Sequence, residues 1–114
     1  MTIPLPPKLK NRLARCKEGL RGIDLVLQGS LTERFMPCGK PGCRCQAEPP
    51  ELHGPYYQWT AKVDGKTKTI RLHKEDLEKF RGFIAEGRRL EEYIREWRAL
   101  SLEAIEEYLR KERS

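Results

Sequence analysis

The sequence of 114 residues predicts an α+β fold with a helix near each end and a three-stranded antiparallel sheet between them. Three observations carry this prediction: an apolar stripe at helical spacing, two β-prone runs joined by Asp-Gly, and a long helix-compatible C-terminal stretch. The length suits one domain rather than two. We expect an extended tail over 1–7, a helix over 8–28, a sheet with a cysteine-rich loop over 29–73, and a long helix over 74–110.

The N-terminal helix is predicted from apolar side chains that recur every three or four residues. They are Leu9, Leu13, Cys16, Leu20, Ile23 and Leu27. Pro6 and Pro7 suit the first turn of such a helix. Gly19 and Gly22 weaken its second half, so an end near residue 20 is the alternative. Because Cys16 lies on the apolar stripe, we interpret it as a small buried apolar residue.

The sheet is predicted from three β-prone segments. Residues 56–63 and 66–72 flank Asp64-Gly65, which is the strongest short-range signal for a hairpin. Pairing across this turn gathers apolar side chains on one face, which we expect to pack against the start of the C-terminal helix. Residues 30–36 alternate as a third strand, in which we expect Leu31 and Phe35 to be buried.

The other face of the predicted sheet is polar, and we predict that it binds nucleic acid. Its side chains are Thr32, Arg34, Gln58, Thr60, Lys62, Thr67, Thr69 and Arg71. A β-ribbon or sheet fits the major groove of DNA, where these side-chain types bond base edges and phosphates. Arg34 and Arg71 are suited to bidentate contacts with guanine. The alternative is an ordinary solvent face, which is commonly rich in Thr, Lys and Arg.

The C-terminal helix is predicted from a stripe that runs from Phe83 to Tyr108, with a second apolar row near its end. At about 1.5 Å per residue it would be a rod of roughly 55 Å, too long for a globule of this size. It therefore either breaks, near Gly87 or Ser101, or projects and pairs with another helix. Trp97 lies beyond the reach of the sheet. It should meet the N-terminal helix, a folded-back end of its own helix, a second copy of the chain or another protein.

A cysteine-rich loop carries the pattern C-x4-C-x-C-x7-H, formed by Cys38, Cys43, Cys45 and His53. Thiolate and imidazole are the ligands that tetrahedral zinc prefers, and three Cys with one His is a common closed structural set. We therefore predict a structural Zn²⁺ that organises this loop. Two alternatives stay open: free thiols in a loop held by hydrogen bonds alone, and His73 as the fourth ligand. A disulfide is not expected in a reducing compartment.

The charge is distributed unevenly along the chain. Residues 1–74 carry 14 Lys and Arg against 6 Asp and Glu, whereas residues 75–114 carry 9 against 11. A basic first part points to nucleic acid, the commonest large polyanion, although a basic protein need not have such a partner. No apolar run is long enough to span a membrane and no secretory signal is visible, so we expect a cytoplasmic protein.

Together these features predict a non-enzymatic accessory protein that binds nucleic acid, with DNA favoured. The polar sheet face and the basic N-terminal helix would make the contacts, and a homodimer would double them. A rival prediction is an adaptor that docks on a larger protein through its long C-terminal helix. A weaker alternative is a zinc-dependent nuclease, although only Glu48 and Glu51 lie near the cysteines and nothing else forms a catalytic constellation.

Four segments resemble a family of small bacterial proteins that carry a domain of unknown function and are often encoded near transposases and other mobile elements. They are 29–34, 38–45 (CGKPGCRC), 52–59 (LHGPYYQW) and 65–67. The resemblance covers about residues 25–110. It implies a basic, cysteine-containing protein with a terminal helix, and its genomic setting favours DNA binding. In architecture, the expected sheet and helix also resemble integrase arm-binding domains, which is an analogy of fold alone.

Overall fold

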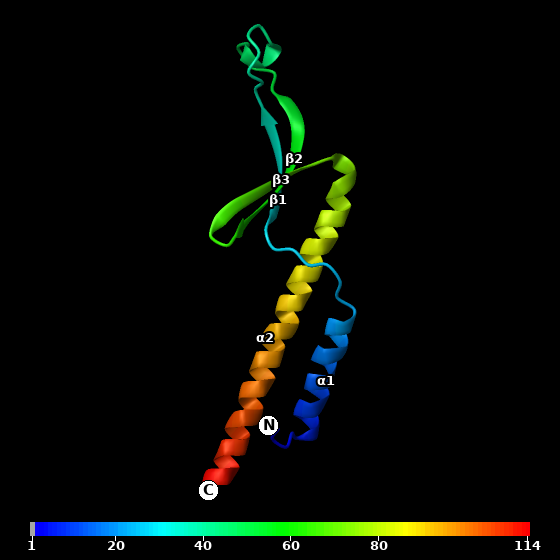
Figure 1. Cartoon of the computed structure of the whole chain (residues 1–114), viewed down its shortest axis with the longest axis vertical. Coiled ribbons are helices and arrows are strands. Elements are labelled where there is room, and N and C mark those ends of the chain that lie inside the picture. Colours follow the sequence, from blue (N-terminus) through cyan, green and yellow to red (C-terminus); the bar gives the residue numbers. More distant parts are fainter. Residues whose placement is uncertain (1) are drawn as a thin grey trace. The chain divides into compact units, whose positions relative to one another are not determined.

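An N-terminal helix, a three-stranded antiparallel sheet and a long C-terminal helix make up the computed structural model, which describes residues 2–114. The α+β prediction is therefore confirmed. Along the chain (Figure 1) the elements are α1 (Pro7–Arg21), β1 (Ser30–Met36), the 3₁₀ turn η1 (Arg44–Gln46), β2 (His53–Val63), β3 (Lys66–Leu72), the 3₁₀ turn η2 (Lys74–Asp76) and α2 (Leu77–Arg113). None of the helices in the described chain is long and apolar enough to span a membrane.

The chain divides into two compact units. The sheet unit is the continuous run Leu27–Ile84, and the helical unit combines the residues up to Val26 with Ala85–Ser114. Met1 lies outside the described residues. Helix α2 contributes its first turns to the sheet unit and the rest of its length to the helical unit.

In the sheet, β2 lies between β1 and β3, and both pairings are antiparallel. The predicted hairpin register is confirmed, from Val63 opposite Lys66 to Tyr57 opposite Leu72. Asp64 and Gly65 both have positive φ, 53° and 80°. These values match the type I′ turn that Asp-Gly favours in two-residue hairpins.

One face of the sheet packs against the start of α2, as predicted. The buried residues of this cluster are Trp59, Leu72, Leu77 and Ile84, and Leu27, Leu31, Tyr57, Ala61 and Phe80 surround them. The indole N–H of Trp59 donates a hydrogen bond to the carbonyl of Gln28 at 2.8 Å. This bond ties the segment before β1 to the same core.

The expectation that Phe35 is buried is wrong, because its side chain is 53% exposed. Strand β1 pairs regularly with β2 as far as Arg34 opposite Tyr56, and the register then shifts before Met36 pairs with His53. The core beneath α2 includes Leu31 at the start of β1 but does not extend to Phe35 near its end. Leu31 is itself half-buried.

The predicted helix over 8–28 is wrong beyond Arg21, where α1 ends. Gly22 caps it, and the glycines at 19 and 22 make further helix unfavourable. The apolar residues beyond Arg21 keep the same spacing in sequence, but Leu27 packs in the sheet unit and not beside α1. The N–H of Leu27 bonds to the carbonyl of Phe83 at 3.0 Å, and its side chain joins the core of the sheet unit.

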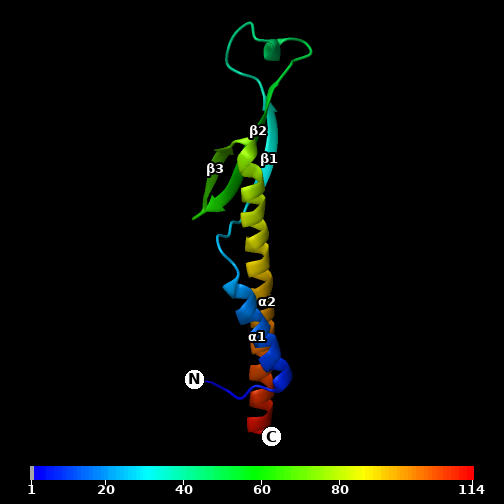
Figure 2. The ribbon, with the colours of Figure 1, turned by 90° about the vertical axis from the view of Figure 1, so that its right-hand side faces the viewer.

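Of the two alternatives for the long C-terminal helix, a break near Gly87 or Ser101 is wrong, since α2 runs for 37 residues without interruption. In the helical unit, α1 lies beside α2 in both views (Figures 1 and 2). Their core contains Leu9, Cys16, Leu100 and Ala104, with Ile3, Leu5, Leu13 and Trp97 packed around it. The N-terminal helix is thus the partner that Trp97 meets. Packing on both parts of α2 outweighs the roughly 1 kcal/mol cost of a glycine in a helix.

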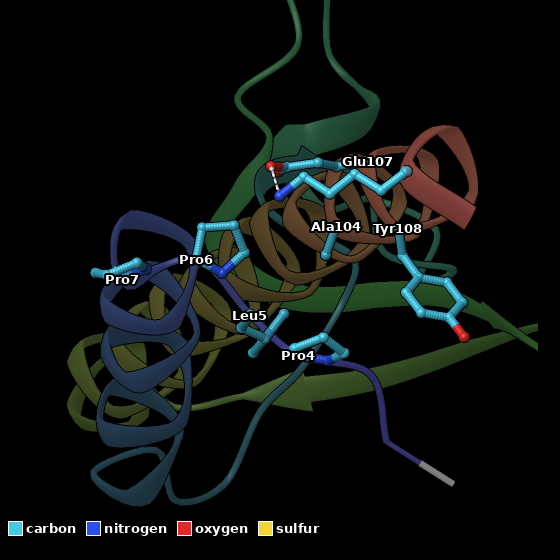
Figure 3. A pocket seen from close by; sticks show the side chains of 8 residues that line it. Pro4, Leu5, Pro6, Pro7, Ala104, Glu107 and Tyr108 are labelled. Atoms are coloured by element: carbon cyan, nitrogen blue, oxygen red, sulfur yellow. Dashed lines mark ion pairs between the residues drawn. The ribbon is translucent and has the colours of Figure 1, made fainter. Parts of the chain in front are cut away.

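Residues 2–6 form the extended segment before α1, as predicted, although the predicted tail over 1–7 included Pro7, which begins α1. The segment lies against the last turns of α2 (Figure 3). Pro4, Leu5 and Pro6 line a hollow of about 370 Å³ together with Ala104 and Tyr108. Across the helix pair, Arg12 bonds to the carboxylates of Glu96 and Glu103, both at 2.7 Å. These contacts fix α1 along α2.

Candidate metal centre and polar sheet face

The loop between β1 and β2 brings three cysteines and one histidine together. Cys38, Cys43 and Cys45 lie in the loop, and His53 is the first residue of β2. One ligand atom from each of the four residues lies within 4.8 Å of the others. The predicted cluster is therefore confirmed as a group that could hold a metal ion.

The spacing of these atoms suits a small tetrahedral ion. The sulfurs of Cys38 and Cys45 are 3.5 Å apart, and the Cys43 sulfur lies 3.1 Å from Nε2 of His53. Zinc–sulfur bonds of about 2.3 Å in a tetrahedron place neighbouring sulfurs about 3.8 Å apart. Both separations are shorter than this value, and the four ligand atoms all lie within 4.8 Å of one another, so the cluster could hold a metal ion.

Backbone and side-chain hydrogen bonds hold the loop in this shape. The backbone N–H of Cys38 points to the sulfur of Cys45 at 3.2 Å, and the side-chain amide of Gln46 donates to the Cys38 carbonyl at 2.7 Å. The turn η1 carries Cys45 inward, where it is buried. These bonds hold the start of the loop beside the turn η1 in its middle, independently of any metal.

The cysteines of the cluster differ in acidity. A hydrogen bond with the backbone of Cys45, followed by contacts with the His53 ring and the neighbouring thiols, lowers the pKa of Cys43 to about 6. Burial raises the pKa of Cys45. Without metal, Cys43 is therefore the thiol of this pair that is ionised at neutral pH. A bound metal ion would favour the thiolate form of all three.

Two other residues of ligand type are used elsewhere. His73 precedes η2, where its backbone N–H donates to the carboxylate of Asp76 at 3.1 Å. The histidine in the cluster is His53, so the alternative with His73 is wrong. Cys16 is 1% exposed within the helical core, which confirms its interpretation as a buried apolar residue. Burial also raises the pKa of the Cys16 thiol.

The strand register places all eight predicted polar residues on one face of the sheet. Directly opposed residues form the rows Thr32–Gln58–Arg71, Ser30–Thr60–Thr69, Lys62–Thr67 and Arg34–Tyr56. Gln58 and Thr60 are half-buried, and the other six predicted residues are exposed. We call this set of rows the polar sheet face.

Tyr56 belongs to the polar sheet face and was absent from the sequence-based site. The guanidinium carbon of Arg71 lies 4.3 Å from the centre of the Tyr56 ring, which is a cation–π contact. The sequence pattern is sufficient to place Tyr56 on this face, because Tyr56, Gln58 and Thr60 alternate along β2 with the core residues Tyr57 and Trp59.

These observations define a small α+β protein in which a Cys₃His cluster adjoins the strands of a polar-faced antiparallel sheet. The chain belongs to the family described as Domain of unknown function (DUF6788), which matches residues 7–82. The match includes α1, the whole sheet, the Cys₃His cluster and the first turns of α2. No curated protein and no solved structure matches the chain.

Proposed function

We propose that this protein is a non-enzymatic nucleic-acid-binding protein, with DNA as the favoured partner, that makes contact through the polar sheet face. The observation that carries the proposal is the register, which gathers Arg34, Lys62 and Arg71 among hydroxyl and amide side chains on one face. Side chains of this kind bond phosphates and the edges of bases.

The charge of this face supports the proposal beyond its composition. None of the residues in its rows is acidic. Within residues 2–114, no ion pair engages Arg34, Lys62 or Arg71. A solvent face built only for solubility usually mixes both signs of charge. Three cations without an ion pair, on a face without acids, are therefore better suited to a polyanion.

The Cys₃His cluster supports a structural rather than a catalytic role for zinc. Four protein ligands complete a tetrahedral shell and leave no position for water or substrate. Zinc held by Cys38, Cys43, Cys45 and His53 would cross-link the loop to the start of β2. Lys40 and Arg44, which lie between the ligands in sequence, would then be held near the same end of the sheet.

Binding of the zinc-loaded protein to labelled duplex DNA, measured by fluorescence anisotropy between about 50 and 200 mM salt, tests the proposal. The logarithm of the affinity should fall linearly with the logarithm of the salt concentration. Arg71→Ala should cost about 1–3 kcal/mol of binding free energy if Arg71 reads a base. Arg98→Ala is the matched control, because Arg98 is an exposed arginine in the helical unit.

Equal losses in Arg71→Ala and Arg98→Ala would show that net charge, not the polar sheet face, binds nucleic acid. Cleavage of the labelled DNA that depends on a divalent metal would contradict the non-enzymatic part of the proposal. The mobile-element association remains a separate expectation, because neither experiment addresses it.

An adaptor that binds another protein through α2 is the second candidate. Leu102, Ile105 and Leu109 are exposed on this helix, at 58%, 47% and 36%. A hollow of about 410 Å³ beside them is lined mainly by apolar side chains, including Ile94 and Trp97. A partner that remains bound after nuclease treatment, and is lost in Leu102→Glu, would favour this function over nucleic-acid binding.

A further inference from the structure

A hollow of about 690 Å³ lies where β3 ends and β2 continues toward the Cys₃His cluster. Tyr56, Tyr57, Arg71, His73 and Lys74 line it, together with Pro55 and Leu72. Strand β3 pairs with β2 only as far as Tyr57 opposite Leu72. Tyr56 therefore lies one residue beyond the pairing, at a step in the sheet.

The hollow combines an aromatic ring with a cation that is already in contact with it. The guanidinium of Arg71 lies 4.3 Å from the centre of the Tyr56 ring. Tyr56 is half-buried and pairs with Arg34 across β1 and β2, whereas Arg71 is exposed. A strand residue held in this way loses little conformational freedom when a planar ligand stacks on the pair.

The charge of the hollow points to an anionic ligand. None of its lining side chains is acidic. No ion pair of the described chain engages Arg71 or Lys74. The nearby carboxylate of Asp76 accepts the backbone N–H of His73 and so caps η2. The hollow beside Pro4 differs, since there Glu107 pairs with Lys111 at 3.2 Å.

We propose that this hollow binds an unpaired nucleotide of a single-stranded nucleic acid. The base stacks on the Tyr56–Arg71 pair, and Lys74 faces the phosphate backbone. An unpaired base is required, because the faces of a base inside a duplex are covered by its neighbours. This inference rests on the proposed function and narrows its ligand to nucleic acid with a single-stranded segment.

The test compares two single strands of about 12 nucleotides. One is a fluorescein-labelled oligothymidine, and the other has the same phosphates but abasic sugars. Zinc-loaded wild-type protein should bind the oligothymidine roughly tenfold or more tightly than the abasic strand, as expected for a stacked base. Tyr56→Ala should lose this preference, whereas Tyr56→Phe should keep it. Tyr108→Ala, which alters a tyrosine of the helical unit, should bind as the wild type does.

The outcomes separate this inference from the proposed function. If Tyr56→Ala binds oligothymidine as tightly as the wild type while Arg34→Ala and Lys62→Ala bind it weakly, the hollow is not the site and the polar sheet face still is. If the wild type binds neither strand nor duplex DNA, both ideas fail. If Tyr56→Ala does not fold, the wild-type preference for bases over abasic sugars decides, and equal affinity for both strands overturns the inference.

Discussion

Burial and hydrogen bonding make the four cysteines chemically different. In metal-free protein at pH 7, Cys43 should be alkylated by iodoacetamide first and Cys16 last. The pKa of Cys43 is lowered to about 6, so its thiolate predominates, whereas burial raises the pKa of Cys16 and shields it. Alkylation of Cys43 should slow as the pH falls below 6, because its thiolate is then protonated. Peptide mass spectrometry over time measures the order, and equal rates would contradict it.

Metal content provides a separate check on the Cys₃His cluster. We expect about one zinc per chain in purified protein, retained in Cys16→Ser and lost in Cys38→Ser. Elemental analysis measures it. Removal of zinc by a chelator should loosen residues 37–55 first in hydrogen exchange, because local hydrogen bonds and the exposed Arg44–Glu51 ion pair then remain to hold this segment. A metal-free protein whose loop is as protected as before would contradict the prediction.

Gly54 is the backbone position on which the bulge beside His53 depends. Its φ is 146°, and an added Cβ would lie 2.8 Å from the carbonyl oxygen of Arg34. Gly54→Ala should therefore lower the free energy of unfolding by about 1–3 kcal/mol and weaken zinc binding. Gly39→Ala is the control, since nothing lies within 4 Å of its Cβ. Equal denaturant midpoints and zinc affinities in the two variants would contradict this account.

At the scale of the elements, local chemistry explains what the sequence predicts well. The hairpin register follows from Asp64-Gly65, whose turn type sets the pairing of β2 and β3. The Cys₃His cluster follows from ligand types within one short segment. Long-range packing explains why the predicted N-terminal helix was too long, because Leu27 packs in the core of the sheet unit and not on α1. The exposure of Phe35 depends on how far the core extends along β1, and the Tyr56–Arg71 contact depends on two strands, so neither is visible in one segment.

The pairing of α1 with α2 depends in part on Arg12. Its guanidinium bonds to Glu96 and Glu103, and these bonds raise its pKa. Arg12→Ala should lower the free energy of unfolding only slightly, because exposed ion pairs contribute little, although two carboxylates would lose their shared partner. Arg15→Ala, on the exposed side of the same helix, should change it little. The difference should shrink at high salt in urea denaturation curves. A difference that is independent of salt would contradict the electrostatic explanation.

For the whole molecule, the exposed row Leu102, Ile105 and Leu109 bears on self-association. Because Trp97 packs within the helical unit, we place the contact between copies on this row and not on the stripe of Trp97. At micromolar concentrations we expect light scattering to give twice the monomer mass of 13.3 kDa. Ile105→Glu should give the monomer, because it places charges in an apolar contact. A wild-type mass of one chain, or a dimer that survives Ile105→Glu, would contradict this placement.

The division of the chain into two units bears on the order in which the sheet unit and the helical unit can fold during synthesis. The sheet unit is one continuous run of 58 residues, whereas α1 needs the later part of α2, which begins only after that run. An isolated helix of 15 residues is marginal in water, so α1 gains little order before that partner exists. During synthesis α1 is made before the sheet. Leu9 and Cys16 stay exposed to solvent until Leu100 and Ala104 of α2 have been synthesised. We therefore expect α1 to become stably ordered together with the later part of α2, after the whole sheet unit has been synthesised.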